Sequence, residues 1–324
     1  MSEGRPDVVT VGETMALVAF NDTGPVRVGS TGRLSIGGAE SNVAIGLARL
    51  GHRSAWIGRV GDDAMGRLIE STLRGEGVDV SGVTHDPDVA TGAMLREHRS
   101  FDRFRVDYYR KGLAGSRLAP EHLDPALVGS ASIVHVTGIS PAVSPTAGAA
   151  ALRAMELAHR VGATVSFDVN HRSALWSSAQ ATSVLTDFTE ASDIVFAGPE
   201  EAELVAGVEP GSVGVEGLVE LLAQHGAQEV VIKNGVAGAT GWLRDGDELV
   251  SVPARAVTCI DPVGAGDAFV AGYLSARLDR LGLAERLERG TICGAFAVSV
   301  SGDWEGAPRR AELGFLSGVE NVLR

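Results

Sequence analysis

Short runs of β-branched and other apolar residues alternate with longer segments that carry apolar residues at helical spacing. The short runs predict buried strands, and they occupy residues 8–11, 55–57, 131–136, 163–167, 193–196 and 229–232. The longer segments predict helices, and the clearest occupy residues 39–50, 64–74, 145–161 and 217–225. This alternation is typical of an α/β fold, in which helices cover both faces of a mostly parallel sheet. Ligands of such folds bind at the carboxyl ends of the strands.

Two regions break this rhythm. Residues 14–36 and about 90–112 alternate polar and apolar positions without a helical partner, as in Ala93-Met94-Leu95-Arg96-Glu97. Alternation with a period of two is typical of strands that have one buried face. We therefore expect a small separate β-sheet, one face of which covers a pocket.

The most informative stretch is residues 261–274, which read Asp-Pro-Val-Gly-Ala-Gly-Asp-Ala-Phe-Val-Ala-Gly-Tyr-Leu. Gly264, Ala265 and Gly266 expose backbone N–H groups with little side chain to block an anion. The apolar segment behind them predicts a helix, whose N-terminus favours negative charge. The carboxylate of Asp267 would repel a bound phosphate, so its position suggests a base that deprotonates a hydroxyl attacking that phosphate. The alternative is that Asp267 only caps the helix.

A second glycine-rich run, Gly37-Gly38-Ala39-Glu40-Ser41-Asn42, also precedes a predicted helix. Because glycine has no Cβ, the pair Gly37 and Gly38 lets the backbone approach a ligand closely. Asn42 then lies one turn into the helix, where it offers a donor and an acceptor to a hydroxylated ligand. Taken alone, the glycine pair could equally form a plain turn.

Composition narrows the classes of function. The chain has 324 residues, 44% of them apolar, and a formal net charge of −13, so it can bury a sizeable core. Nucleic-acid binding needs a basic surface, and the negative charge argues against it. Cys259 and Cys293 show neither metal-ligand nor disulfide spacing, and the N-terminus has no signal-like segment. We therefore expect a cytoplasmic protein with no membrane attachment.

The two glycine-rich runs together resemble the signatures of ribokinase-like (PfkB-type) carbohydrate kinases. Residues 37–61 match the first signature through the glycine pair, Asn42, Ala44, Gly51 and Gly61. Residues 261–274 match the second signature, which is highly specific for the family. The resemblance covers essentially the whole chain. It implies a single kinase domain over residues 1–324, with a three-layer α/β/α core and a small β-sheet lid inserted from about 14–36 and 90–112.

The resemblance also implies the parts of a phosphoryl-transfer site. In such kinases the aspartate at the position of Asp267 is the catalytic base, and the N–H groups of Gly264, Ala265 and Gly266 form the anion hole. ATP is the expected phosphoryl donor. Its implied contacts are Asn170, Lys233, Gly235, Gly238, Gly264 and Gly266. For Lys233, at the end of a predicted strand, the alternative is an ordinary solvated lysine.

Magnesium is required by the chemistry, although the sequence shows no ligand cluster for it. The family often carries Asn-x-x-Glu near the metal, and residues 198–201 here read Gly-Pro-Glu-Glu. The asparagine is thus missing, and Glu201 is left to hold a magnesium-bound water. Many members also bind a monovalent cation such as K⁺, which the resemblance suggests near Asp261 and Val263.

Within the family, several stretches resemble the kinases that act on 2-keto-3-deoxygluconate. They are Gly37-Gly38-Ala39-Glu40, Tyr108-Tyr109-Arg110, Phe167-Asp168-Val169-Asn170-His171-Arg172 and Gly302-Asp303-Trp304-Glu305-Gly306-Ala307-Pro308. An arginine reads a carboxylate bidentately, so Arg110 and Arg172 are candidates for the carboxylate of that sugar acid, with Tyr108 beside it. The other expected substrate contacts are Gly37, Gly38, Asn42, Asp267 and Asp303. Surface arginines, tyrosines that pack the lid, and a role of Arg172 at the ATP phosphates are the alternatives.

The hypothesis is therefore ATP-dependent phosphorylation of the terminal (C6) hydroxyl of 2-keto-3-deoxygluconate, a small-molecule sugar acid. A fructokinase or another neutral-sugar kinase is the alternative within the family. A catalytically idle sugar- or nucleotide-binding sensor is the alternative of a different class. The lid strands alternate Tyr, Val and Phe with charge, and lids pair across a dimer in some relatives, which predicts a homo-oligomer.

Overall fold

The main sheet of the protein is mostly parallel, as the sequence predicts. The computed structural model describes residues 5–100 and 103–315. Within these ranges, the main sheet comprises β1 (Val8–Val11), β4 (Ser54–Ile57), β9 (Ile133–Thr137), β10 (Thr164–Asp168), β11 (Ile194–Ala197), β12 (Glu229–Lys233), β13 (Ala239–Leu243) and β14 (Glu248–Val252). The strand order is β14-β13-β12-β11-β10-β9-β1-β4, and the strands from β12 to β4 run parallel. The six strands predicted from the sequence correspond to the six parallel strands β1, β4, β9, β10, β11 and β12.

The sequence reading missed the antiparallel edge of this sheet. β13 pairs antiparallel with β12, and β14 with β13. The residues of β14 are mostly exposed, whereas the predicted strands are nearly continuous buried runs. An edge strand that faces solvent needs no continuous apolar run, so it gave no such signal.

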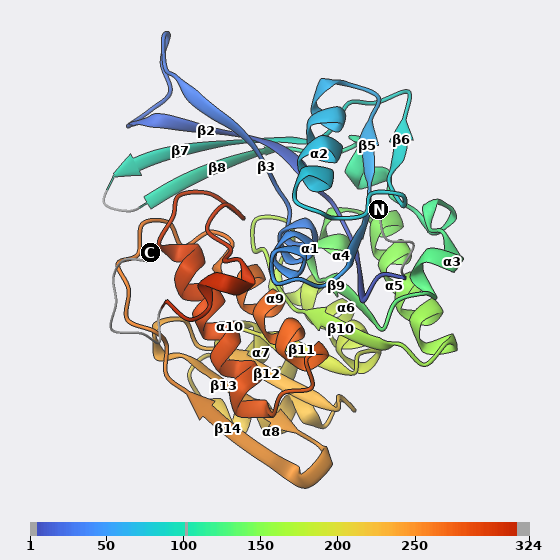
Figure 1. Ribbon diagram of the computed structural model, residues 1–324, viewed down its shortest axis with the longest axis vertical. Coiled ribbons are helices and arrows are strands. Elements are labelled where there is room, and N and C mark those ends of the chain that lie inside the picture. The colour runs from blue at the N-terminus through green and yellow to red at the C-terminus, as the bar shows by residue number, and fades with distance from the viewer. Residues whose placement is uncertain (1–4, 101–102, 316–324) are drawn as a thin grey trace.

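Helices cover both faces of the main sheet, which gives three layers (Figure 1). The helices of the described ranges are α1 (Ala39–Arg49), α2 (Ala64–Gly75), α3 (Pro125–Val128), α4 (Ile139–Val143), α5 (Pro145–Arg160), α6 (Ser178–Glu190), α7 (Pro199–Ala206), α8 (Val215–Ala223), α9 (Ala265–Leu278) and α10 (Leu283–Val298), of which α2 lies beside the smaller sheet. Helices α5 to α8 share a core with Val9 and Val134, whereas α1, α9 and α10 share one with Val8 and Ile133. Successive strand residues thus feed opposite cores, as the period of two requires. The predicted α/β class is confirmed.

A smaller sheet lies above the main one, at the top of the molecule in Figure 1. It contains β2 (Met15–Thr23), β3 (Gly32–Gly37), β7 (Ala93–Ser100) and β8 (Arg103–Tyr109), in the order β3-β2-β7-β8. These strands come from the two regions that broke the helical rhythm. Met15, Leu17 and Met94 form a hydrophobic cluster of their own on it. A separate pair, β5 (Arg59–Gly61) and β6 (Thr84–Asp86), lies nearby.

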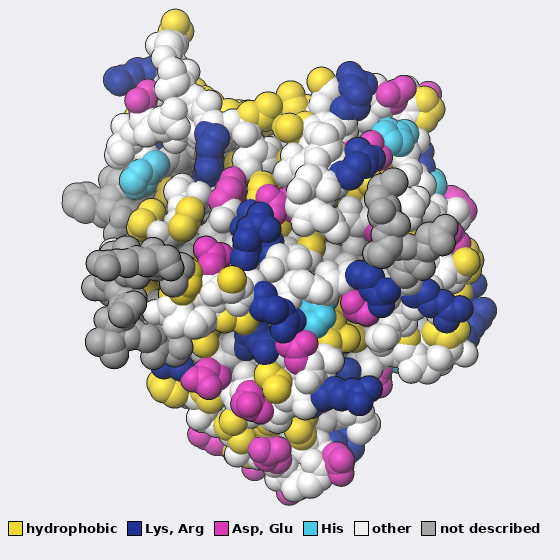
Figure 2. Space-filling view, in the orientation of Figure 1, with side chains coloured by type: hydrophobic (Ala, Val, Ile, Leu, Met, Phe, Trp, Pro, Cys, Tyr) yellow, Lys and Arg dark blue, Asp and Glu magenta, His cyan; other side chains and the backbone are white. Residues whose placement is uncertain are grey.

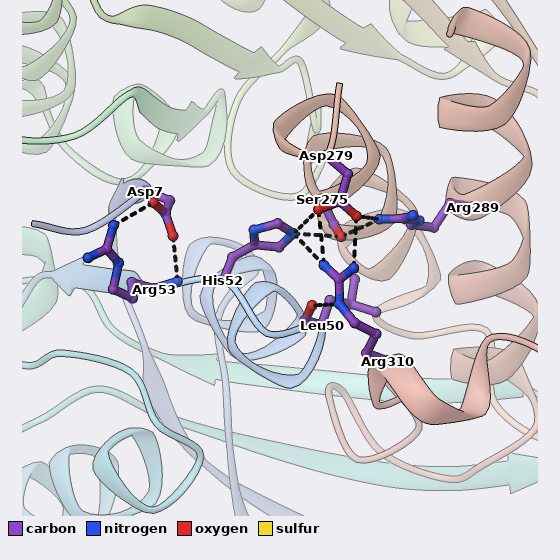
Figure 3. A network of polar contacts seen from close by, with 8 residues as sticks. All are labelled: Asp7, Leu50, His52, Arg53, Ser275, Asp279, Arg289 and Arg310. Atoms are coloured by element: carbon purple, nitrogen blue, oxygen red, sulfur yellow. Dashed lines mark hydrogen bonds and ion pairs between the residues drawn. The ribbon is translucent and has the colours of Figure 1, made fainter. Parts of the chain in front are cut away.

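A polar network anchors the C-terminal end of α9 (Figure 3). The carboxylate of Asp279, directly after this helix, pairs with Arg289 of α10 at 2.5 Å and with Arg310 at 2.9 Å. The Nε2 atom of His52, after α1, lies 2.9 Å from the hydroxyl of Ser275 on α9. The network therefore joins α1, α9, α10 and the segment that follows α10.

The face of the molecule seen in Figure 2 carries acidic and basic side chains side by side rather than in separate patches. Exposed ion pairs of this kind contribute little to stability individually. Within residues 5–100 and 103–315, no helix has both the length and the apolar character needed to cross a lipid bilayer.

Candidate active site

A cavity of about 640 Å³ lies where the carboxyl ends of the parallel strands meet the smaller sheet. Its lining includes Glu13 after β1, Asn170 after β10, Glu201 on the helix after β11, and Lys233 at the end of β12. This is the edge at which α/β sheets bind ligands. The smaller sheet contributes Met15, Leu17, Met94, Arg96, Phe104, Val106 and Tyr108. One face of that sheet therefore covers the site, as the sequence reading expected of it.

The two glycine-rich runs meet at this cavity. The amide Nδ2 of Asn42 on α1 donates to Oδ2 of Asp267 on α9 at 2.8 Å. One turn further along, a Cβ added to Gly46 would lie 2.6 Å from the Cβ of Ala271, so the two helices touch there. Because Gly46 permits this close approach, Asn42 can reach Asp267 directly. The structure thus joins residues that are 225 positions apart in sequence.

The carboxyl group of Asp267 is buried, and burial raises its pKa to about 6. The hydrogen bond from Asn42 and the positive charges of Arg172 and Lys233 lower the pKa, but they do not outweigh burial. Gly264 holds the N-cap position of α9, and the hydrogen bond of the Asp267 side chain is to Asn42 rather than to the helix backbone. Asp267 is therefore not the cap of α9, and its role as a base stays a prediction.

The backbone before Asp267 forms the start of α9. Gly264 is the N-cap residue in a left-handed conformation, with φ 75°, and Ala265 begins the helix. A Cβ at Gly264 would lie 1.7 Å from the carbonyl oxygen of Asp303. Gly264 is therefore required by both its conformation and its packing. Gly264 and Gly266 line the cavity, so the positive end of the helix dipole faces it.

Lys233 is not a solvated lysine. Its Nζ donates to Oδ2 of Asp168 at 2.5 Å, and only 16% of its side chain is exposed. Three carboxylates, of Asp168, Glu201 and Asp267, raise the pKa of Lys233 against the effect of burial. Asp168 ends β10 beside Lys233, but the sequence reading gave it no role. Its position at the carboxyl end of a predicted strand, where α/β folds bind ligands, was the feature that could have indicated a site residue.

Arg110 is buried at the end of β8 and forms an ion pair with Glu13. Its guanidinium carbon lies 5.7 Å from the ring centre of Tyr108, and both residues line the cavity. Burial raises the pKa of Glu13, while the charge of Arg110 lowers it. The Nε of Arg110 has no hydrogen-bond partner among the described residues. Arg110 is therefore not a surface arginine, and part of its hydrogen-bonding capacity is open.

Arg172 also lines the cavity, in the segment that follows β10. No hydrogen bond or ion pair of its side chain occurs in the described part of the chain. Its positive charge acts on Asp267, whose pKa it lowers. Among the cavity-lining cations of that part, Arg96, Arg110 and Lys233 each pair with a carboxylate, so Arg172 presents the charge that is left uncompensated.

Asp303, a predicted substrate contact, pairs with a residue that the sequence reading gave no role. Arg96 of β7 lies 3.2 Å from Oδ1 of Asp303 and 3.1 Å from Oδ2 of Asp261. Burial raises the pKa of Asp303 to about 7. The sequence placed Arg96 only in an alternating stretch and did not predict its surroundings. The two carboxylates that hold it inside lie far away in sequence.

Two other buried acids were given no role from the sequence: Glu13 lines the cavity, whereas Glu40 lies outside its lining. Oε1 of Glu40 accepts a hydrogen bond from Thr137 at 2.7 Å. The side chain fills the space over Gly12, where an added Cβ would lie 2.1 Å from its Cδ. Burial raises the pKa of Glu40 to about 7. Glu13 lies two residues after β1, and this position at the carboxyl end of a strand was the one feature of the sequence that could have indicated a site residue.

Of the remaining predicted site residues, some line the cavity and others lie outside its lining. Gly37 and Gly38 line the cavity; a Cβ on either would lie 2.3 Å from a neighbouring atom, so close packing requires the pair. Asn170 lines it in a positive-φ conformation, with φ 39°. Gly235 and Gly238 form the turn after β12 and lie outside the cavity lining. The ligand contacts assigned to these residues stay predictions.

The residues near Lys233 fit a magnesium ion that is carried mainly by phosphates. Oδ1 of Asp168 is buried without a hydrogen-bond partner. Glu201 lines the cavity, and its oxygens accept from the N–H groups of His171 and Gly198. No group of three acidic, histidine or cysteine side chains in the described ranges forms a ligand set on its own. Mg²⁺ commonly uses one or two carboxylates together with substrate phosphates.

Comparison with known proteins gives one consistent family. The family model described as pfkB family carbohydrate kinase matches residues 5–310. A relative from Bacillus subtilis (strain 168), named 2-dehydro-3-deoxygluconokinase, is 38% identical over 321 residues, which are 98% of this chain and 97% of that protein. Fructokinase-1 of Zea mays is 32% identical over 323 residues, which are 97% and 98% of the two chains.

A solved structure agrees. The crystal structure of a putative ribokinase II from E. coli in complex with ATP and Mg²⁺ has a TM-score of 0.86 and 25% sequence identity. The match covers 96% of this chain and 99% of that one. The ribokinase-like fold expected from the two signatures is thereby confirmed.

The start of α9 generates a stability prediction. Gly264→Ala should lower the free energy of unfolding by about 2–3 kcal/mol, because alanine meets both a positive φ and the carbonyl of Asp303. Gly266→Ala is the matched control. Its nearest new contact is 3.5 Å away, so its effect should stay below about 1 kcal/mol. Urea unfolding measures both, and equal stabilities of the two variants would contradict the geometry.

Proposed function

Because the chain belongs to the pfkB family of carbohydrate kinases, we propose that it transfers the terminal phosphoryl group of ATP to the C6 hydroxyl of 2-keto-3-deoxygluconate. This compound is the 2-dehydro-3-deoxygluconate of the Bacillus subtilis relative's name. The observation that carries the proposal is the buried carboxyl of Asp267, held by Asn42 beside the N-terminus of α9.

Asp267 acts as the general base. It takes the proton of the C6 hydroxyl while the hydroxyl oxygen attacks the terminal phosphorus of ATP, and ADP leaves. A pKa of about 6 leaves the carboxylate mostly ionised at neutral pH and makes it a stronger base than a solvated aspartate. The hydrogen bond from Asn42 aims the carboxylate without removing its charge.

The N–H groups at the start of α9 receive the charge of the transferring phosphoryl group. The helix dipole supports them, and Lys233 adds a fixed positive charge, since a Cβ at Gly266 would lie 3.5 Å from its Nζ. Glu201, through a bound water, and Oδ1 of Asp168, which has no partner in the described ranges, would hold magnesium. Magnesium bound to the ATP phosphates neutralises their charge when present.

The sugar acid places its two ends against different cations. If C6 lies at Asp267, the carboxylate lies at the opposite end of the six-carbon chain. Arg172, whose charge acts on Asp267, then serves the phosphoryl group. Arg110, directly after β8 and beside Tyr108, is left for the carboxylate, which an arginine binds well through its planar donors.

A neutral-sugar kinase is the second candidate. Arg110 is already paired with Glu13, so the cavity can hold this arginine without a substrate carboxylate. The similarity to maize fructokinase-1 also supports a neutral sugar as the substrate. In that case the Glu13–Arg110 pair would bind sugar hydroxyl groups.

The experiment that tests the function is ADP release from ATP and magnesium, with 2-keto-3-deoxygluconate, fructose, ribose and adenosine assayed in parallel. Turnover confined to the keto-deoxy acid, with phosphate found on C6 by ³¹P and ¹³C NMR, supports the proposal. Turnover on fructose instead supports the second candidate. Ligand-induced thermal stabilisation without ADP release from any sugar would contradict both and would point to a sensor.

The role of Asp267 predicts the effect of one substitution. Asp267→Asn keeps the size and the contact with Asn42 but cannot accept the proton, so kcat should fall by about 10²–10⁴-fold. The KM for ATP should change much less. Steady-state kinetics on the folded variant measure this, with Asp187→Asn, the same change at an exposed aspartate of α6, as the control. A kcat near that of the parent protein would rule Asp267 out as the base.

The pKa of Asp267 predicts the pH dependence of turnover. Protonation removes the base, so kcat/KM should fall about tenfold per pH unit below a midpoint near pH 6. Asn42→Ala removes a hydrogen bond that lowers this pKa, so its midpoint should lie at higher pH. The titration of ATP itself is the same in the assays of both proteins. A difference between the midpoint of Asn42→Ala and that of the parent protein therefore reports on the enzyme. Identical midpoints would contradict the assignment.

The role of Arg110 predicts a substrate-dependent effect. Arg110→Met should raise the KM for 2-keto-3-deoxygluconate by about 10–100-fold, since a charged hydrogen bond contributes about 1.5–3 kcal/mol. The KM for ATP should stay within a small factor. Lys111→Met, an exposed neighbour, is the control. An equal rise for fructose and for the keto-deoxy acid would show that Arg110 does not read the carboxylate.

A further inference from the structure

Arg96 is a buried cation on the smaller sheet. It lies on β7, and its guanidinium bridges two buried carboxylates, at 3.1 Å from Asp261 and 3.2 Å from Asp303. Its guanidinium carbon also lies 5.4 Å from the ring centre of Phe104 on β8. A buried charge is retained only where it is well paired, so this arrangement ties the sheet firmly to residues 261 and 303.

Both partners of Arg96 hold the segment that leads into α9. Oδ1 of Asp261 accepts from the N–H of Val263 at 3.1 Å, and Oδ2 accepts from the N–H of Gly302 at 3.0 Å. The carbonyl oxygen of Asp303 packs against Gly264, where it fills the place of a Cβ. Arg96 therefore helps to position the amides of residues 264–266 in two ways, through Asp261 and through Asp303.

Asp261 and Val263 are also where the family resemblance suggests a monovalent cation. Each oxygen of Asp261 already accepts an N–H, and Oδ2 faces the fixed charge of Arg96 at 3.1 Å. A cation beside the same carboxylate would be repelled by that guanidinium, strongly so in a buried place. The residues present do not fit a site that needs K⁺ to neutralise Asp261.

We propose that Arg96 is a positioning residue, and that its guanidinium supplies from within the chain the positive charge that a monovalent cation would supply beside Asp261. It orders the segment before α9, so that the amides of residues 264–266 point at the transferring phosphoryl group without bound K⁺. The inference rests on the proposed function only in taking these amides as the anion hole.

The first test uses the unmodified protein. ADP release and thermal melting are compared in KCl, NaCl and tetramethylammonium chloride at equal ionic strength, which keeps general screening constant. We expect rates within about twofold and no melting shift specific to K⁺, since a bound cation would stabilise the fold as its concentration rises. A K⁺-specific stimulation of about tenfold or more, or a K⁺-specific rise in melting temperature, would overturn the proposal.

The second test replaces Arg96. Arg96→Met keeps much of the stem but removes the charge, and kcat should fall by about 10²-fold with smaller changes in both KM values, as expected for a misplaced catalytic group. Arg96→Lys should recover part of the loss, and added guanidinium at non-denaturing concentration should raise the kcat of Arg96→Met. The control is Arg105→Met on β8, an exposed arginine that pairs with Asp107. Unchanged kcat in a folded Arg96→Met would overturn the proposal.

The tests separate this inference from the proposed function. The salt comparison by melting needs no sugar, and it remains decisive where Arg96→Met does not fold. The kinetic comparison runs on whichever sugar releases ADP. Loss of turnover in Arg96→Met, alongside normal turnover in Asp267→Asn, would reject Asp267 as the base and retain Arg96 as the positioning residue.

Discussion

The close contact between α1 and α9 is the constraint on which the site depends. Gly46 and Ala271 let the two helices touch, and one turn earlier the amide of Asn42 therefore reaches the carboxylate of Asp267. A larger side chain at Gly46 would push the helices apart and separate this pair. The polar network at the other end of α9 restrains the same helix through Asp279. The orientation of one carboxylate is thus fixed by packing along the whole helix.

Pairing of buried charges is the second organising feature. The chain carries a net charge of −13, yet the site must accept anions. Arg96, Arg110 and Lys233 each face a buried carboxylate, which offsets part of the cost of burying their charge and orders them. Arg172 has no such partner in the described ranges. The cavity therefore holds three cations fixed by carboxylates and, in Arg172, one cation that can meet the negative charge of a ligand.

The sequence predicted the parallel core because its strands are buried on both faces and appear as continuous apolar runs. It also predicted the regions of the smaller sheet, since alternation with a period of two survives in residues 14–36 and 90–112. It missed β13, although most of its residues are buried, and β14, whose exposed residues give no continuous apolar run. For the site, local motifs gave Asp267 and Asn42 but not Arg96 or Glu13. Partners far away in sequence, Asp261 and Arg110, decide the positions of those two.

The ion pairs of Arg96 also limit how the protein can be re-engineered. Strands β7 and β8 carry Arg96 and Tyr108, and Arg110 directly follows β8. Under the proposed function, this segment would be the cassette to exchange for a change of sugar preference. A chimera that imports this cassette alone would also exchange the cation that faces Asp261 and Asp303. The incoming strands and the segments around residues 261 and 303 have to be transplanted as a matched set. Otherwise a change meant for the sugar pocket would leave two buried carboxylates unpaired at the start of α9.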